Sequence, residues 1–283
     1  MKTLNQLLNE PGIIVAPGAY DLVSAKIIEK LGFEVAYVTG LGVTATDLGK
    51  PDLSFITGPE MVRKASTIVQ SVNVPVLCDA DTGFGGLTNI WRTVKEYEAA
   101  GISGIQIEDQ VFPKKCGALP HKEVIPAEEF AEKIRTAVKA RSGKEMLIIA
   151  RTDSKHLGVE EVIRRLNLYV DNGADMTYIG DYFTRKELDK IVKNVKAPIV
   201  ATDSSFLGDN VQPHFTVKEW EEIGVKIIFY WSLPLFTSIG ATQKALRMLK
   251  DKGTIQDMYD EIVSYKKYGE IVDLEIFEKL GKD

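Results

Sequence analysis

The sequence predicts a (β/α)8 TIM barrel, an α/β fold in which eight parallel strands alternate with helices, with additional helices at the C-terminal end. Short runs rich in β-forming residues alternate with helical patterns along the whole chain. Most of these runs are continuously apolar, as expected for strands covered on both faces. An eight-unit barrel takes roughly 250 residues, and the chain has 283. A doubly wound sheet is the alternative, but no G-x-G-x-x-G segment follows the first run.

The predicted strands begin near the N-terminus and recur after each helical pattern. In chain order they are Ile13–Ala16, Val35–Thr39, Val74–Asp79, Gly104–Glu108, Met146–Ala150, Met176–Ile179, Pro198–Ala201 and Lys226–Tyr230. Helical periodicity is clearest in Tyr20–Leu31, Pro59–Gln70, Asn89–Ala100, Ala127–Ala140 and Val159–Asn172. Because no linker or low-complexity segment interrupts the series, we expect one domain over residues 1–283.

The chain continues past the eighth predicted strand, with a helical extension from about residue 235. It contains two stretches with helical spacing, roughly Leu235–Asp251 and Ile255–Leu280. An apolar stripe outside a completed barrel needs a partner. We therefore expect these helices to pack on a neighbouring subunit; packing on the chain's own barrel is the alternative.

Composition excludes several classes of function. The chain is 45% hydrophobic and 27% charged, with a net charge of −5 and no long run of like charges, which argues against nucleic acid or an anionic membrane as its partner. It has no apolar run of membrane-spanning length and no signal-peptide pattern. Two cysteines form no disulfide framework, so we expect a cytoplasmic protein. Three histidines argue against a multi-histidine zinc site.

An acidic stretch after the third strand, D-A-D-T-G-F-G, predicts a metal site. In an extended backbone, residues two apart point the same way, so Asp79 and Asp81 should converge. Two adjacent carboxylates are costly unless a cation lies between them. Mg²⁺, with Mn²⁺ as a possible substitute, is the expected ion because it favours oxygen ligands. The alternative is a solvated turn that caps the next helix.

Other polar segments also fall where predicted strands end, which is where barrel enzymes carry their functional residues. They are T-G-L-G after the second strand, E-D-Q after the fourth, R-T-D after the fifth and T-D-S-S after the seventh. Arg151 faces these acids and would hold a carboxylate or phosphonate with two hydrogen bonds. Two alternatives remain: Glu108 or Asp109 caps a turn, and Arg151 forms an internal salt bridge with Asp153.

Cys116 lies in a polar loop, P-K-K-C-G-A, directly after the fourth strand. Its two neighbouring lysines would favour the thiolate, and a loop cysteine is free to meet a substrate. A loosely buried loop cysteine is the alternative. Cys78, inside an apolar strand, is expected to fill the core.

Together these segments resemble a known family. VTGLGV, LGKPD, DADTGFG, IEDQ, KKCG and ARTD occur in this order, as in the isocitrate lyase/phosphoenolpyruvate mutase superfamily. The resemblance runs from about Pro11 to at least Gly240 and is strongest to short members similar to methylisocitrate lyase and carboxyphosphonoenolpyruvate mutase. It implies a (β/α)8 barrel that forms a homotetramer by exchanging a C-terminal helix between subunits.

The resemblance also implies roles for individual residues. The positions that match substrate-binding residues are Tyr37, Thr39, Gly40, Leu41, Gly117 and Thr202. The positions that match the Mg²⁺ site are Asp79 and Asp81, with Asp52 and Glu108 bonding to metal waters. Arg151 matches the arginine that grips the substrate and its developing oxyanion. Cys116, with Lys114 on the same mobile loop, matches the acid/base of the lyase branch, and mutases lack this cysteine.

Four departures from the lyase pattern concern the distal half of the substrate. Thr202 or Asp203 falls near the position where these lyases carry an asparagine after strand seven. Ala118 follows the KKCG motif where these lyases carry histidine, Gly180 replaces a glutamate after strand six, and no arginine occurs in Trp231–Ser238. Losing a charged partner for a bound carboxylate costs roughly 2–5 kcal/mol. The sequence therefore argues against isocitrate and methylisocitrate. Trp231 and Phe236 predict a more apolar distal pocket.

The resulting hypothesis is a Mg²⁺-dependent carbon–carbon lyase. Its expected substrate is a di- or tricarboxylate or 2-oxo acid, most simply a substituted malate that is cleaved through an enolate to pyruvate or glyoxylate. The alternatives are oxaloacetate decarboxylation or hydrolysis, phosphonomutase chemistry, and a barrel whose site has lost catalysis.

Overall fold

The computed structural model describes residues 2–207 and 212–280. Within them, eight parallel strands follow one another in chain order and close into a barrel, with the last strand paired to the first. The strands are β1 (Ile14–Ala19), β2 (Ala36–Val38), β3 (Val76–Asp79), β4 (Gly104–Glu108), β5 (Leu147–Thr152), β6 (Met176–Ile179), β7 (Ile199–Thr202) and β8 (Ile227–Tyr230). The predicted (β/α)8 barrel is confirmed, and every predicted strand overlaps an observed one.

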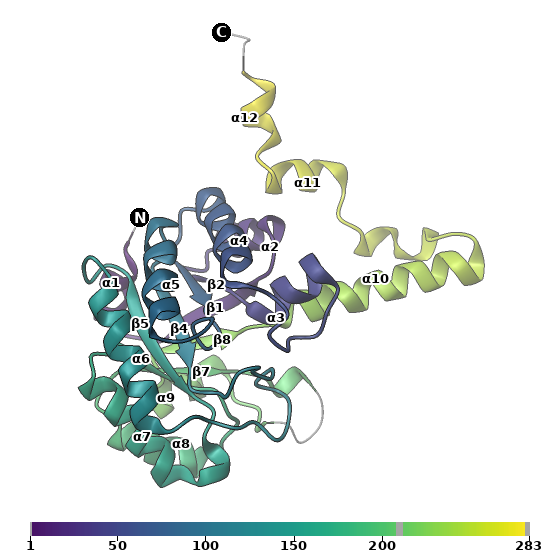
Figure 1. The fold of residues 1–283 in the computed structure, drawn as a ribbon. Helices are drawn as coiled ribbons and strands as arrows, with labels where there is room; N and C mark the ends of the chain where they lie inside the picture. Colours follow the sequence, from purple (N-terminus) through teal and green to yellow (C-terminus); the bar gives the residue numbers. More distant parts are fainter. Residues whose placement is uncertain (1, 208–211, 281–283) are drawn as a thin grey trace.

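Helices surround this barrel (Figure 1). Those that follow the strands are α2 (Leu22–Lys30), α4 (Gly58–Ser71), α5 (Leu87–Ala99), α6 (Ala127–Ala140), α7 (Val159–Asp171), α8 (Arg185–Asn194), α9 (Val217–Ile223) and α10 (Leu233–Lys252). α1 (Leu4–Asn9) precedes the barrel, and a short α3 (Gly40–Val43) leads into a π-helical turn, Thr44–Leu48. Several helix starts are fixed by local sequence, because Thr184 and Thr216 form capping boxes with Glu187 and Glu219.

The strands have an apolar layer on each side. One layer fills the barrel interior, and the other lies between the strands and the surrounding helices. Strand residues that point outward, such as Cys78 and Ile105, pack against the helices and are fully buried, which confirms the predicted core role of Cys78. Inside the barrel, Tyr37 stacks on Phe229 at 4.0 Å, and the edge of Tyr178 meets Phe229 at 5.4 Å. This aromatic group forms a floor beneath the carboxyl ends of the strands.

The C-terminal extension differs from the barrel helices because α10 projects away from the barrel before the chain turns back toward α2 (Figure 1). The second predicted stretch is not one helix. It is a 3-10 turn, Gln256–Glu261, followed by α11 (Tyr265–Ile271) and α12 (Leu274–Glu278). Asp273 interrupts the last two with a left-handed backbone (φ 60°), and its carboxylate bonds Lys26 and Lys30 of α2 at 2.6 Å each. Along the described ranges, no helix combines the length and apolarity needed to span a membrane.

Replacing Phe130 with alanine should lower the free energy of unfolding by about 3–5 kcal/mol. Phe130 is fully buried in α6, and its ring meets Tyr169 of α7 edge-on at 4.7 Å, so truncation leaves a cavity between two helices. Urea unfolding monitored by circular dichroism measures the loss. Leu31→Ala, at a side chain that is 72% exposed, is the control and should change stability by less than about 0.5 kcal/mol. Equal effects of the two substitutions would contradict this assignment of the core.

Candidate active site

A small cavity lies at the carboxyl ends of the strands. Its volume is about 30 Å³, room for roughly two water molecules. The lining residues are Tyr37, Thr39, Leu41, Asp52, Asp79, Cys116, Gly117, Ala118, Arg151, Tyr178, Gly180, Tyr182, Thr202 and Trp231. Nine of the predicted site residues are therefore brought together around one space. The other four, Gly40, Asp81, Glu108 and Lys114, do not line it.

The two aspartates of the acidic stretch converge, but for a different reason from the one expected. Asp79 ends β3, whereas Asp81 has a left-handed backbone (φ 46°) and is not extended. A tight turn, rather than strand alternation, brings them together, and the Asp81 amide donates to Asp79 Oδ1 at 3.0 Å. The Gln106 side-chain amide also donates to this Asp79 oxygen, at 2.8 Å, and to the Tyr37 hydroxyl, at 3.0 Å. Gly40 is required here, because a Cβ at this position would lie 2.7 Å from Asp79 Oδ2.

Lys114 places a buried positive charge among these acids. Its Nζ is 2.5 Å from Asp52 Oδ1 and 3.0 Å from Asp81 Oδ1, and its side chain is only 3% exposed. Burial raises the pKa of Asp81 to about 7, although the Lys114 ammonium opposes the shift. Burial likewise raises the pKa of Glu108 well above its usual range, against the pull of Arg151.

The donor set suits a hard divalent cation. Asp52, Asp79, Asp81 and Glu108 are all buried carboxylates, and Glu108 Oε1 has no hydrogen-bond partner. Among the described residues, no three acidic, histidine or cysteine side chains already converge as an assembled metal cage. The Lys114 ammonium lies between Asp52 and Asp81, and its positive charge compensates these two carboxylates.

Arg151 is held rigidly while it lines the cavity. Its Nε and Nη2 donate to the two oxygens of Asp153 at 2.8 and 3.0 Å, and Nη1 lies 3.1 Å from Glu108 Oε2. The guanidinium also lies 5.1 Å from the centre of the Tyr178 ring. The internal salt bridge considered from the sequence is thus present, and Arg151 also lines the cavity.

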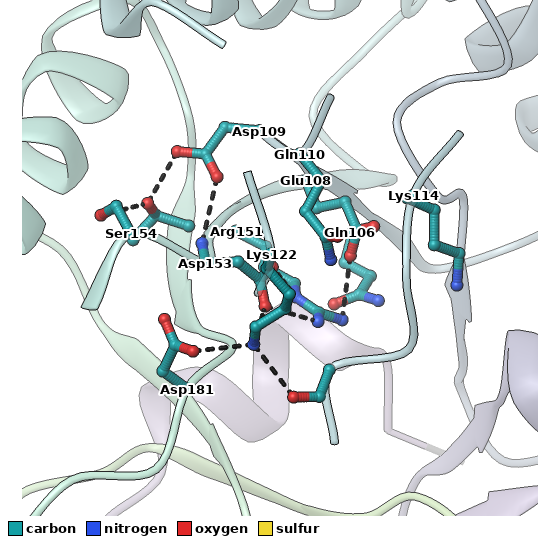
Figure 2. A network of polar contacts seen from close by, with 12 residues as sticks. Gln106, Glu108, Asp109, Gln110, Lys114, Lys122, Arg151, Asp153, Ser154 and Asp181 are labelled. Carbon is teal, nitrogen blue, oxygen red and sulfur yellow. Dashed lines mark hydrogen bonds and ion pairs between the residues drawn. The ribbon is translucent and has the colours of Figure 1, made fainter. Parts of the chain in front are cut away.

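Asp109, next to Glu108, points away from the cavity (Figure 2). This fully buried carboxylate accepts from Thr152 Oγ1 at 2.7 Å, from the Asp153 amide at 3.0 Å, from the Tyr169 hydroxyl at 2.8 Å and from Arg165 Nη1 at 3.1 Å. It does not cap a turn. It fixes the backbone at the end of β5, and therefore the segment that carries Arg151.

Cys116 faces the cavity as a thiol. Its amide donates to the Asp52 carbonyl at 3.0 Å, and its side chain is nearly buried. Burial raises its pKa to about 11, and the negative charge of Asp52 adds to this effect. The expectation of a thiolate is therefore wrong. The nearby Lys114 ammonium is engaged by two carboxylates, and burial outweighs what attraction remains.

The distal wall of the cavity is uncharged. Trp231 lines it and donates from Nε1 to Ser204 Oγ at 2.8 Å. Phe236 does not line it, and its ring packs edge-on against Trp231 with the ring centres 6.4 Å apart. At Gly180, a Cβ would lie 2.4 Å from Arg151 Nε and 2.7 Å from Asp153 Oδ1. A glutamate there is incompatible with this arginine position. Arg151 is the single cationic side chain among the lining residues.

Two further residues, which the sequence analysis did not single out, complete this site. Gln106 orients Asp79, and Lys122, at the far end of the Cys116 loop, bonds Asp153 at 2.7 Å. Gln106 had a signal, since it lies two positions before Glu108 on the same strand and therefore on the same face. Lys122 had none, because its partner is far away in sequence.

Comparison with known proteins identifies the family. Residues 4–250 match the family model described as phosphoenolpyruvate phosphomutase. The chain belongs to this family, within the isocitrate lyase/phosphoenolpyruvate mutase superfamily.

Members of the phosphoenolpyruvate phosphomutase family resemble the chain over nearly its full length. It is 38% identical to 2-methylisocitrate lyase of Aeropyrum pernix, covering 98% of the chain and 88% of the relative. It is 36% identical to 2,3-dimethylmalate lyase of Eubacterium barkeri, covering 96% and 93%. A solved structure of oxaloacetate acetylhydrolase with the inhibitor 3,3-difluorooxalacetate superimposes with a TM-score of 0.92 at 31% identity, covering 99% of the chain and 95% of that structure. The predicted enzyme class, a lyase, is confirmed.

We expect the Cys116 thiol of this family member to stay protonated through neutral and mildly alkaline pH. A raised pKa favours the neutral form, so the proton is lost only as the pH approaches about 11, whereas an ordinary cysteine is half ionised near about 8.5. Thiolate absorbance at 240 nm, titrated from about pH 7 to 10 and corrected by the same titration of Cys116→Ser, measures the ionisation. A Cys116 transition below about pH 9 would contradict the buried-thiol geometry.

Proposed function

We propose that the protein is a Mg²⁺-dependent carbon–carbon lyase that cleaves a small substituted 2-hydroxy diacid, through an enolate, to a small 2-oxo acid. The observation that carries this proposal is a nearly buried cysteine, Cys116, facing the same cavity as Arg151 and Asp79. Its burial raises the pKa of the thiol and so favours the protonated form. A phosphonomutase needs no proton donor for carbon, whereas a carbon–carbon lyase does.

The geometry gives each residue a role in that cleavage. The substrate hydroxyl gives its proton to Asp52, a carboxylate that lines the cavity, and its carbon–oxygen bond becomes the carbonyl of the 2-oxo acid. The bond between this carbon and its neighbour breaks in the same step, and the electron pair remains on the neighbour as an enolate. Arg151, rigidly paired with Asp153 and Glu108, stabilises the developing negative charge without reorganising. The Cys116 thiol then donates its proton to the enolate carbon. Mg²⁺ bound by Asp79 and Asp81, with Asp52 and Glu108 holding its waters, would add positive charge at the enolate oxygen.

The lining of the cavity supports a small diacid rather than a tricarboxylate. Arg151 is its one cationic side chain, and Ala118, Gly180 and Trp231 offer no partner for a further carboxylate. The similarity to 2,3-dimethylmalate lyase points the same way. The similarity to 2-methylisocitrate lyase points to a tricarboxylate; we give more weight to the pocket, because side chains rather than overall identity select the substrate.

Oxaloacetate hydrolysis or decarboxylation is the second candidate. It is favoured by the superposition with oxaloacetate acetylhydrolase. It requires the same stabilisation of an enolate, and no space for an alkyl-substituted distal half.

The deciding experiment is a turnover assay with Mg²⁺ on a panel of alkyl-substituted malates, oxaloacetate, methylisocitrate and a phosphonate. We expect release of pyruvate or glyoxylate from a substituted malate but not from methylisocitrate, and loss of activity when EDTA removes the metal. Cys116→Ser should lower kcat by about 10²–10⁴-fold, because a poorly acidic hydroxyl replaces the proton donor. Cys78→Ala, at a cysteine outside the site, is the matched control. Turnover of oxaloacetate alone would favour the second candidate, and formation of a carbon–phosphorus bond would overturn both.

We also propose that the protein is a homotetramer in which α10–α12 pack on a neighbouring subunit. α10 projects away from the barrel, and α10 and α12 expose large apolar side chains, among them Leu246 at 60%, Leu249 at 50% and Phe277 at 63%. Light scattering should give four times the chain mass of 31.4 kDa. Leu246→Asp combined with Leu249→Asp should shift the mass to smaller species, since a buried interface does not accept two unpaired charges. A monomer mass for the unsubstituted protein would contradict this proposal.

We propose that the protein is located in the cytoplasm. Both cysteines are free, and proton donation by Cys116 requires a reduced thiol. A reducing compartment preserves that state.

A further inference from the structure

Lys122 is a second lysine of the Cys116 loop that is held by carboxylates. Its Nζ donates to the Gly117 carbonyl at 2.9 Å and to Asp153 Oδ1 at 2.7 Å, and lies 2.7 Å from Asp181 Oδ1. Three oxygens thus satisfy the three donors of the ammonium. Its side chain is 7% exposed, and Figure 2 shows its contact with Asp181. This is a fully satisfied, nearly buried cation outside the predicted site.

The three partners of Lys122 belong to three separate segments. Gly117 is the residue after Cys116, Asp153 follows β5, and Asp181 follows β6. Burying an ammonium is unfavourable unless it is paired, and here Asp153 and Asp181 outweigh burial and raise the pKa of Lys122. The pairing therefore holds this end of the loop against the barrel.

Asp153 connects this contact to the catalytic arginine. The carboxylate that accepts from Lys122 also holds Nε and Nη2 of Arg151. The Lys122 ammonium therefore bonds the Gly117 carbonyl, next to Cys116, and also the Asp153 carboxylate, which orients Arg151. Asp181, the other anchor, stands next to Gly180, where the Arg151 position leaves no room for a side chain.

We propose that Lys122 is a positioning residue, which seats the Cys116 loop on the barrel through Asp181 and Asp153 and so fixes the thiol relative to Arg151. The expected effect of Lys122 on turnover rests on the proposed lyase function. Its expected effect on the accessibility of the Cys116 thiol is independent of that function. The cavity is too small to admit a diacid without movement of its walls, so the strength of this contact sets how readily the loop lifts.

The test is the rate at which Cys116 reacts with a thiol reagent at about pH 8, with Cys116→Ser giving the background from Cys78. Lys122→Met should raise the rate about tenfold or more, because one half of a buried ion pair is lost. Asp181→Asn should raise it in the same direction, and the double substitution should add little, since both remove the same contact. Lys115→Met is the matched control, because the half-buried Lys115 donates from its ammonium to the His121 carbonyl at 2.8 Å and pairs with no carboxylate among the described residues.

Turnover provides the second measurement. Lys122→Met should lower kcat by about 10–100-fold with a smaller change in KM, because the proton donor is displaced while the substrate contacts remain. Lys122→Arg, which keeps the charge, should recover part of the loss. Equal thiol reactivity in Lys122→Met and Lys115→Met, or an increase that Asp181→Asn does not share, would overturn the assignment. Raised reactivity in a protein that cleaves no carbon–carbon bond would support the role of Lys122 in seating the loop and overturn only the proposed function.

Discussion

The site depends on the compensation of buried negative charge at the mouth of the barrel. The carboxylates Asp52, Asp79, Asp81, Glu108 and Asp153 are all buried there, and they exceed the cations that face them, Lys114, Lys122 and Arg151. Isolated charges are strongly disfavoured in such surroundings. Two of the three cations are carried by the Cys116 loop. The loop therefore supplies most of the positive charge that pairs with these acids, and the excess of acid is what a divalent cation would balance.

The same charges explain the state of the cysteine. A thiol flanked by lysines in sequence is expected to ionise, yet here Lys114 bonds carboxylates and Asp52 lies beside the sulfur. Burial and the negative charge of Asp52 together favour the protonated form of the Cys116 thiol. A neutral thiol beside a fixed guanidinium is suited to giving a proton to a carbanion, rather than to attacking an electrophile.

Sequence reasoning reached the barrel because continuous apolar runs report strands buried on both faces, and polar residues at strand ends then followed from topology. Asp79, Arg151 and Cys116 were found in this way. It failed where contacts depend on loops: Asp81 converges through a left-handed turn, and Lys122 meets Asp181 far along the chain. Phe236 was misplaced because the path of the chain after β8 decides which aromatic faces the cavity, and Trp231 comes first.

Gly180 constrains how this pocket can change over evolution. Any side chain there meets the Arg151 guanidinium or the Asp153 carboxylate before it reaches the cavity. A lineage that acquired glutamate at this position without first relocating that pair would lose the arginine's alignment. The order of substitutions is thus restricted: the Arg151–Asp153–Lys122 contacts must loosen before position 180 can vary. A single substitution at position 180 is therefore not enough to place a further charged side chain in this pocket.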